Sequence, residues 1–199
     1  MPSPATAPAE VLAVLSRVLA DWGALWYVFG AQAVLVWGRP RLTADIDVTV
    51  RLVPEDPPRF VQAMSEHGFQ VRVGNAEEFV RRTRVLPFVH VPTGLAIDVV
   101  LGGPGPEELF LSRAVMVDFG GLTVPVISPE DLVVTKVLAG RPKDWEDVHG
   151  VLAERGQFLH LETIRATLAL IEDALGQSNL RPAFEAALAR AQRTDRGYT

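Results

Sequence analysis

The chain has 199 residues, of which 48% are hydrophobic and 22% are charged. This composition excludes a mainly disordered protein and predicts one ordinary hydrophobic core, or one core with a small appendage. The absence of cysteine excludes disulfides, zinc–thiolate sites, thiol nucleophiles and iron–sulfur clusters, so any metal would bind to oxygen or histidine ligands. The net charge of −5 argues against a broad basic surface for nucleic acid and leaves room only for a local one.

The predicted elements change character along the chain. Apolar residues at helical spacing predict a helix over 11–19, then a buried strand over 25–29 and a helix over 31–37 that opens at Gly30. Alternation with period two predicts a strand over 45–50. Further strands are predicted at 69–73, 85–91, 95–101, 114–118 and 122–127, and further helices at 58–66, 77–82, 129–139, 144–154, 161–175 and 181–192. We therefore expect an α/β (α+β) core over 1–127 followed by a helical region over 128–199.

No uninterrupted apolar run approaches the roughly 20 residues that a bilayer-spanning helix needs. The N-terminal segment contains several prolines and no early basic residue, unlike a secretory signal. These features predict a cytoplasmic protein with no membrane contact.

Acidic residues on two predicted strands are the strongest chemical signal. Residues i and i+2 of a strand share a face, so Asp45 and Asp47 project together, and a hard divalent cation such as Mg²⁺ would relieve their repulsion. Asp98 interrupts an apolar run, where an unpaired carboxylate is costly. If the two strands are neighbours, the three carboxylates form the ligand set of a two-metal centre for phosphoryl or nucleotidyl transfer. Two alternatives remain: solvated carboxylates on edge strands, and pairing of Asp98 with one of the many arginines.

The turn at Gly30-Ala31-Gln32 is a weaker signal. A glycine between strand and helix allows the backbone to approach a ligand, and the helix N-terminus offers N–H groups to a phosphate. Many α/β proteins turn in this way for packing alone, and the sequence contains neither a full dinucleotide fingerprint nor a Walker motif.

The only two lysines of the chain, Lys136 and Lys143, lie close together in the helical region. Ser128 is a suitable N-cap for the first helix there, on which Lys136 faces inward. A buried ammonium needs an anion, and either a triphosphate or Asp144 would serve. Asp144 could equally be a helix N-cap after Pro142. Three other charged residues are interpreted as surface or supporting groups: Arg141, Lys143 and Asp147.

Together these segments resemble the nucleotidyltransferase superfamily of the DNA polymerase β type. Gly30-Ala31, then Gly38-Arg39-Pro40-Arg41-Leu42-Thr43-Ala44-Asp45-Ile46-Asp47, and then Asp98 follow its motif order. The continuation Ser128-Pro129-Glu130-Asp131-Leu132, Lys136, Ala139-Gly140-Arg141-Pro142-Lys143-Asp144 and Asp147 resembles the AbiEii-like bacterial branch, many members of which are toxins of toxin–antitoxin pairs.

The resemblance implies a mixed sheet with flanking helices and transfer of a nucleoside monophosphate from an NTP to an acceptor, with Mg²⁺ as cofactor. Asp45, Asp47 and Asp98 would be the metal-binding and catalytic carboxylates, and Lys136 and Asp144 would belong to the same active centre. The residues that it implies for nucleotide binding are Gly30, Ala31, Gln32, Arg39, Arg41, Thr43 and Lys136. Ala31 departs from the pattern, because the superfamily usually has Ser or a second Gly there.

The acceptor is not readable from the residues. Family analogy favours RNA, in particular a tRNA end, with a small molecule or a protein side chain as alternatives, and it implies a possible cognate antitoxin. Arg81, Arg82 and Arg84 are the best candidates for an RNA contact. The rival interpretation, which Ala31 supports, is a catalytically weak nucleotide-binding or partner-binding module of the same fold.

Overall fold

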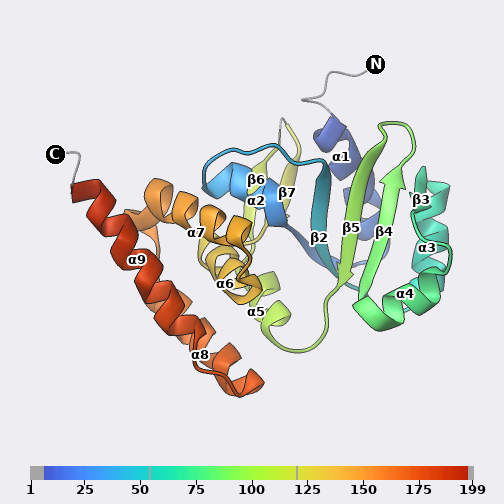
Figure 1. Ribbon diagram of the computed structural model, residues 1–199. Coiled ribbons are helices and arrows are strands. Elements are labelled where there is room, and N and C mark those ends of the chain that lie inside the picture. Colours follow the sequence, from blue (N-terminus) through green and yellow to red (C-terminus); the bar gives the residue numbers. More distant parts are fainter. Residues whose placement is uncertain (1–6, 54, 120, 197–199) are drawn as a thin grey trace. The chain divides into compact units, whose positions relative to one another are not determined.

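A computed structural model describes residues 7–53, 55–119 and 121–196, with side chains to residue 193 (Figure 1). The predicted class, a mixed α/β fold with flanking helices and a helical C-terminal region, is confirmed. The chain divides into two compact units. The first combines Met1–Gln32 with Leu42–Val126, and the second combines Ala33–Arg41 with Ile127–Thr199. The second unit therefore contains a short early segment in addition to the C-terminal helices.

The first unit is built on one mixed sheet with the strand order β3-β4-β5-β2-β1-β7-β6. The pairs β2–β5 and β1–β7 are parallel and the other pairs are antiparallel. The strands are β1 (Leu25–Phe29), β2 (Asp45–Arg51), β3 (Phe69–Val71), β4 (Val85–His90), β5 (Leu95–Leu101), β6 (Val115–Asp118) and β7 (Thr123–Val126). Each strand lies within a predicted range or within one residue of it.

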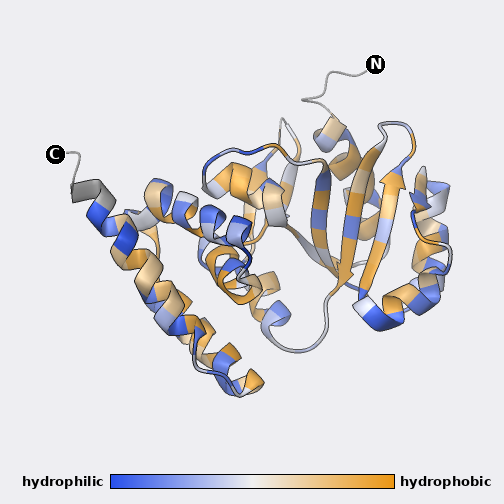
Figure 2. Ribbon diagram, viewed as in Figure 1, coloured by the Kyte–Doolittle hydropathy of each residue, from blue (hydrophilic) through white to orange (hydrophobic). Residues whose placement is uncertain are grey.

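Alternation along the central strands separates the core from the acidic face. Ile46, Val48 and Val50 of β2 and Ile97 and Val99 of β5 are fully buried. The intervening residues point to the opposite face, as the period of two requires. Figure 2 shows the resulting change between hydrophobic and hydrophilic residues along these strands.

The described residues of the first unit include the helices α1 (Ala7–Asp21), α3 (Pro57–Glu66), α4 (Ala76–Thr83) and α5 (Pro106–Arg113). The side chains of Asp56 and Asn75 cap α3 and α4 by accepting hydrogen bonds from backbone N–H groups at 3.1 and 3.0 Å. Helix α3 packs against β3, and α4 packs against β4. Helix α5 was not predicted, because the Gly- and Pro-rich segment before it is typical of a loop. Its proline lies in the first turn, where the missing N–H costs no hydrogen bond.

The second unit is helical. It contains α6 (Pro129–Ala139), α7 (Pro142–Arg155), a 3₁₀ turn (Gly156–Phe158), α8 (Leu161–Leu175) and α9 (Leu180–Arg196), together with most of α2 (Gly30–Trp37). The predicted N-cap of α6 is confirmed, since Ser128 Oγ accepts from the Asp131 N–H at 3.1 Å. Trp37 Nε1 donates to the Ile127 carbonyl at 2.8 Å, which fixes the end of α2 within this unit.

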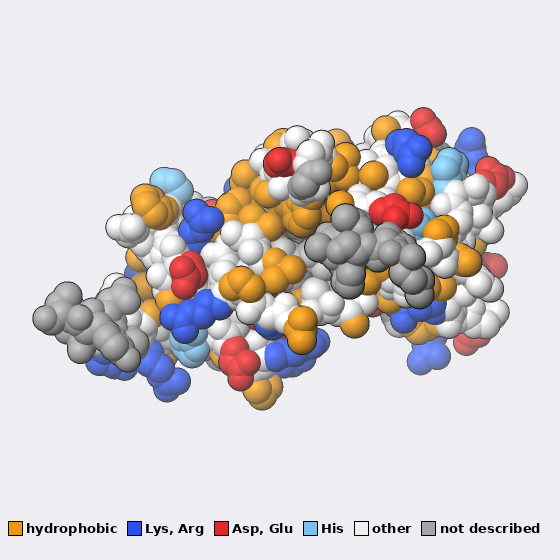
Figure 3. All heavy atoms as spheres, turned by 90° about the horizontal axis from the view of Figure 1, so that it is seen from above, with side chains coloured by type: hydrophobic (Ala, Val, Ile, Leu, Met, Phe, Trp, Pro, Cys, Tyr) orange, Lys and Arg blue, Asp and Glu red, His pale blue; other side chains and the backbone are white. Residues whose placement is uncertain are grey.

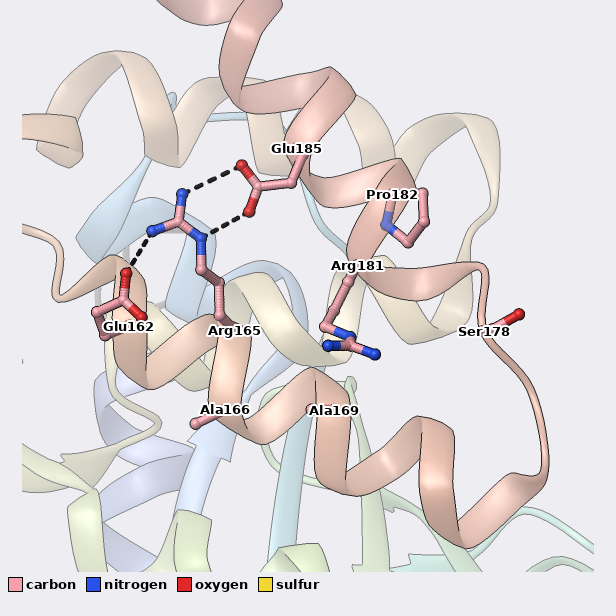
Figure 4. Close-up of a pocket in the computed structure, with 8 residues that line it drawn as sticks. All are labelled: Glu162, Arg165, Ala166, Ala169, Ser178, Arg181, Pro182 and Glu185. Atoms are coloured by element: carbon pink, nitrogen blue, oxygen red, sulfur yellow. Dashed lines mark hydrogen bonds and ion pairs between the residues drawn. The ribbon is translucent and has the colours of Figure 1, made fainter.

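Ion pairs connect the last two helices. Arg165 on α8 donates to Glu162 at 2.6 Å and to Glu185 on α9 at 2.6 Å (Figure 4). The nearly buried Glu172 accepts from the Arg181 side chain at 2.6 Å and from its backbone N–H at 3.0 Å, so it also binds the first turn of α9. No helix within the described ranges has both the length and the apolar character needed to cross a bilayer.

Candidate active site

The strand register brings three carboxylates together on one face of the sheet. Asp47 on β2 lies opposite Asp98 on β5, and Asp45 lies two residues before Asp47 on the same face. One carboxylate oxygen from each residue can be chosen so that all three lie within 4.8 Å of one another. The condition for convergence of the three carboxylates, that the two strands be neighbours, is therefore met.

These carboxylates fit a hard divalent cation. All three are only partly buried, so the cluster is open to solvent and to a ligand. Oxygen ligands are those that Mg²⁺ prefers, and like charges this close repel one another unless a cation lies near them. The residues that could hold metal are thus Asp45, Asp47 and Asp98.

Thr43 and Gln32 both contact Asp45. The Thr43 hydroxyl donates to Asp45 Oδ1 at 2.8 Å and lies 3.2 Å from the Asp45 carbonyl oxygen. The buried Gln32 amide donates to the same carbonyl at 3.5 Å. Both side chains therefore hold the backbone at the start of β2, and Thr43 also holds the first carboxylate of the cluster. Ala31 is also buried, with 5% of its surface exposed.

Gly30 lies against Asp47. Its φ of +61° is in the left-handed region, which favours glycine. A Cβ at this position would lie 1.9 Å from Asp47 Oδ2. The strand-to-helix turn therefore needs glycine for two reasons, its backbone conformation and the space that the carboxylate occupies.

Arg72 is a residue of this site that the sequence analysis missed. Its Nη2 donates to Asp98 Oδ1, and its Nε donates to the Phe88 carbonyl at 2.9 Å. Arginine pairing of Asp98 was one of the open alternatives, and it occurs together with the convergence of the carboxylates. Arg72 lies 26 residues before Asp98 in a segment without a motif, so only the sheet register could have identified it.

The second unit contains a separate buried cluster around Lys136. The Lys136 ammonium contacts Asp144 Oδ1 at 3.2 Å and Asp147 Oδ2 at 2.7 Å. Arg41 donates to both oxygens of Asp147 at 2.9 and 3.2 Å. Arg141 donates to Asp144 through Nε at 2.5 Å and Nη2 at 3.2 Å. The inward direction predicted for Lys136 is confirmed, since only 7% of its surface is exposed.

The structure excludes one alternative for each of two residues in this segment. Asp147, interpreted as a surface or supporting group, does not lie on the surface, because it is 3% exposed and binds both Lys136 and Arg41. Asp144 is not the N-cap of α7, since Arg141 is the N-cap and Asp144 accepts from its backbone N–H at 3.3 Å. Helix α7 begins two residues earlier than predicted, which places Asp144 in its first turn.

The cations of this cluster keep both aspartates ionised. Burial raises the pKa of Asp144, but hydrogen bonds from Arg141 and the charge of Lys136 outweigh it and leave that pKa below its usual value. Burial likewise raises the pKa of Asp147, and hydrogen bonds from Arg41 and Lys136 bring it below the usual value. The Lys136 ammonium therefore lies between two ionised carboxylates.

The remaining candidate arginines differ in their surroundings. Arg39 forms a long, exposed ion pair with Glu154 at 3.5 Å. Arg81 and Arg82 are exposed in the last turn of α4, whereas Arg84 is bound to Glu55 at 2.6 and 2.9 Å. On the face shown in Figure 3, basic and acidic side chains are interspersed among hydrophobic and neutral atoms.

One family model matches nearly the whole chain. The sequence model of the family described as nucleotidyl transferase AbiEii toxin, Type IV TA system, matches residues 13–196. The chain belongs to this family. It is therefore a nucleotidyltransferase, which confirms the enzyme class that the resemblance implied. No curated protein sequence matches the chain.

Solved structures share the nucleotidyltransferase fold of this AbiEii family member. The solution structure of the antibiotic-resistance factor ANT(2'')-Ia is similar with a TM-score of 0.60 and 11% identity, over 86% of this chain and 94% of that chain. An antigenic nucleotidyltransferase-like protein from Paracoccidioides brasiliensis is similar with a TM-score of 0.52 and 16% identity, over 90% and 91% of the two chains. A crystal structure of ANT(2'')-Ia in complex with adenylyl-2''-tobramycin gives a TM-score of 0.50 at 12% identity, over 95% and 99%.

Proposed function

We propose that this AbiEii family enzyme transfers a nucleoside monophosphate from an NTP to an acceptor hydroxyl at the cluster of Asp45, Asp47 and Asp98. The observation that carries the proposal is the approach of one oxygen from each carboxylate to within 4.8 Å of the others. That spacing suits Mg²⁺ ions that share carboxylate ligands, which in two-metal enzymes lie about 3.5–4 Å apart. Bound Mg²⁺ would supply charge neutralisation at the α-phosphate and at the leaving pyrophosphate.

The protein's own groups have distinct parts in this reaction. Asp45 and Asp47 would hold the metal, with Thr43 keeping the Asp45 carboxylate in place through its hydroxyl. Asp98 would also bind metal and would accept the proton of the acceptor hydroxyl on a carboxylate oxygen. The acceptor oxygen then bonds to the α-phosphorus as the bond to pyrophosphate breaks, and pyrophosphate leaves.

The family pattern extends the proposed site to further residues. Gly30, Ala31, Gln32, Arg39, Arg41, Thr43 and Lys136 are proposed to contribute to nucleotide binding, and Lys136 and Asp144 are proposed to act in the active centre. Backbone N–H groups would have to replace the hydroxyl that Ala31 lacks. For Lys136, a phosphate role requires that the ammonium serve the triphosphate in addition to its two carboxylate partners.

For the acceptor we propose RNA, with a tRNA end as the first candidate. The toxin designation of the family supports this choice, as do the exposed Arg81 and Arg82. A small-molecule acceptor is the second candidate, because a structurally similar protein has been crystallised with adenylyl-2''-tobramycin. A cytoplasmic location and a cognate antitoxin partner are parts of the same proposal. The rival, a catalytically weak binding module, predicts no turnover with any acceptor.

The decisive experiment supplies each labelled NTP with Mg²⁺ and either total tRNA or an aminoglycoside. We expect label in the RNA and release of pyrophosphate from the wild-type protein, both lost in Asp45→Asn and Asp47→Asn. Asp21→Asn removes one exposed carboxylate in the same unit and is the matched control. Label in the aminoglycoside but not in RNA would show that the acceptor is a small molecule. Equal background in wild type and both site variants would contradict catalysis at this cluster.

A further inference from the structure

A single row of the sheet connects Arg72 to the acidic cluster. Asp47 pairs with Asp98, and Asp98 pairs with Pro87 on β4. The register of β3 against β4, continued by one residue, brings Arg72 opposite Pro87, and the Arg72 N–H donates to the Pro87 carbonyl at 2.9 Å. Residues directly opposite each other in neighbouring strands share a face. Arg72, Pro87, Asp98 and Asp47 therefore form one row on the face of the carboxylates.

Pro87 explains how the arginine reaches across the sheet. Proline has no N–H to return a hydrogen bond to Arg72, so the pairing of β3 with β4 ends here. Its compact ring leaves space above β4 for a long side chain. Neighbouring strands are about 4.8 Å apart, so a side chain must cover about 10 Å to pass from β3 to β5, which Arg72 and Asp98 do together.

Two hydrogen bonds of Arg72 fix its guanidinium at Asp98. Nε is bound to the Phe88 carbonyl at 2.9 Å, and Nη2 is bound to Asp98 Oδ1. The site thus contains a positive charge next to three carboxylates before any metal enters. With Arg72 the four side chains carry a net charge of about −2, and without it they would carry about −3.

We propose that Arg72 is the resident cation of the acidic cluster, so that divalent metal binding competes with the Arg72–Asp98 ion pair. Arg72 acts on the metal only through Asp98, the carboxylate that both cations bind. The inference rests on the proposed function only in placing the metal at these carboxylates. Arg72 gives the cluster a neutralising partner in the metal-free protein and weakens metal binding when no nucleotide is bound.

The sign of the effect follows from charge. A guanidinium repels a divalent ion bound to the same carboxylate, so its removal should strengthen metal binding. Because both side chains are about one-third exposed, solvent screens this repulsion and the expected gain is about tenfold in affinity. A residue with a merely structural role would change the affinity in the opposite direction, since loosening of Asp98 weakens the site.

The test measures Mn²⁺ binding to the full-length, nucleotide-free protein by electron paramagnetic resonance. We expect Arg72→Gln to bind Mn²⁺ about tenfold more tightly than wild type, and Arg72→Met to do the same with a different side chain. Arg72→Lys keeps the charge and should stay close to wild type. Arg17→Gln, at an exposed arginine on α1, controls for the change in net charge. In an Asp98→Asn background the increase in Mn²⁺ affinity caused by Arg72→Gln should fall below about threefold, because the carboxylate for which the two cations compete is absent.

Thermal melting in a chelator provides a second measurement that needs no metal. Arg72→Gln should melt at a lower temperature than Arg17→Gln, because the Asp98 carboxylate then loses its ion pair beside two other carboxylates. Mn²⁺ affinities of Arg72→Gln and Arg72→Met equal to or weaker than that of Arg17→Gln would overturn the competition, while Mn²⁺ binding by the wild type would leave the proposed function intact. Absence of Mn²⁺ binding in wild type and all variants would overturn both the competition and the metal-dependent function.

Discussion

Gly30 and Asp47 are neighbours at the junction of β1 and α2, and the space between them has no room for a methyl group. A Cβ on Gly30 would lie 1.9 Å from Asp47 Oδ2. The preceding residue, Phe29, pairs with Asp47 across the antiparallel strands, so the turn begins directly beside the carboxylate. The family's glycine thus shapes the acidic cluster itself in addition to any approach of a phosphate to the backbone.

Gly30→Ala should therefore damage the site more than the fold. Gly23 is the matched control, because its φ of +58° imposes a similar strain while nothing lies within 4 Å of its Cβ position. Each substitution should cost about 1 kcal/mol of unfolding free energy from the left-handed backbone. Only Gly30→Ala must also displace Asp47, so we expect at least a 100-fold loss of nucleotidyl transfer in that variant, with near wild-type activity in Gly23→Ala. Parallel urea unfolding and transfer assays measure both effects, and equal activities would contradict the steric account.

Thr43 should matter through its hydroxyl. Thr43→Val keeps the shape of the side chain but removes the donor to Asp45 Oδ1, which leaves one of the proposed metal-binding carboxylates free to rotate. Loss of such a supporting hydrogen bond typically costs 10- to 100-fold in metal affinity or activity, so we expect a drop of about tenfold in Mn²⁺ affinity. Thr43→Ser retains the hydroxyl donor and should keep most of the wild-type Mn²⁺ affinity. If Val and Ser variants bound Mn²⁺ equally, the hydroxyl would have no part in orienting Asp45.

His90 should make the stability of the first unit depend on pH. It is 2% exposed, and burial lowers its pKa, an effect that the charge of Glu10 partly opposes. Since the pKa of His90 is lower in the folded than in the unfolded chain, the unfolded chain carries more bound protons than the folded chain once the pH falls below about 6.5. The stability contributed by neutral His90 is therefore present above the pKa of the unfolded chain. It is lost as the pH falls through the lowered pKa that His90 has in the folded chain.

Urea unfolding between pH 5 and 8 tests this sign. The wild type should lose stability below about pH 6.5, and His90→Gln should remove that part of the dependence. His67→Gln is the control, because His67 is exposed. A curve that is the same for His90→Gln and His67→Gln would show that another group is responsible.

Alternation along the strands made the acidic face predictable. Because side chains of a strand alternate, Asp45 and Asp47 had to share a face, and the buried character of the strand around Asp98 required a compensating group. Helix α6 was predictable for a similar reason, since Ser128 and the following proline define its start locally. These features depend on residues close together in the sequence.

The features that were not predictable depend on the strand register and on the exact start of a helix. Arg72 reaches Asp98 only because β3 is paired with β4 in one register and Pro87 ends that pairing. Asp147 was interpreted as a surface or supporting group, and its partner Arg41, which binds it together with Lys136, comes from a distant segment of the chain. Long-range partners of this kind leave no periodic signal in the sequence.

The two lysines of the chain provide the sharpest test of the second cluster. Lys136→Met removes the ammonium between two buried carboxylates, whereas Lys143→Met removes an exposed one, so the chemical change is the same and the surroundings differ. Removing one partner of a buried ion pair costs about 3–5 kcal/mol, and the lower end, about 3 kcal/mol, is expected here because Arg41 and Arg141 continue to bind the two aspartates. Lys143→Met should change the unfolding free energy by less than about 0.5 kcal/mol. Urea unfolding at pH 7 measures this difference, and KM for the NTP at a temperature where both variants are folded measures the proposed phosphate role. A stable Lys136→Met variant would contradict the structural account, and an unchanged KM in a destabilised variant would restrict Lys136 to holding its unit together.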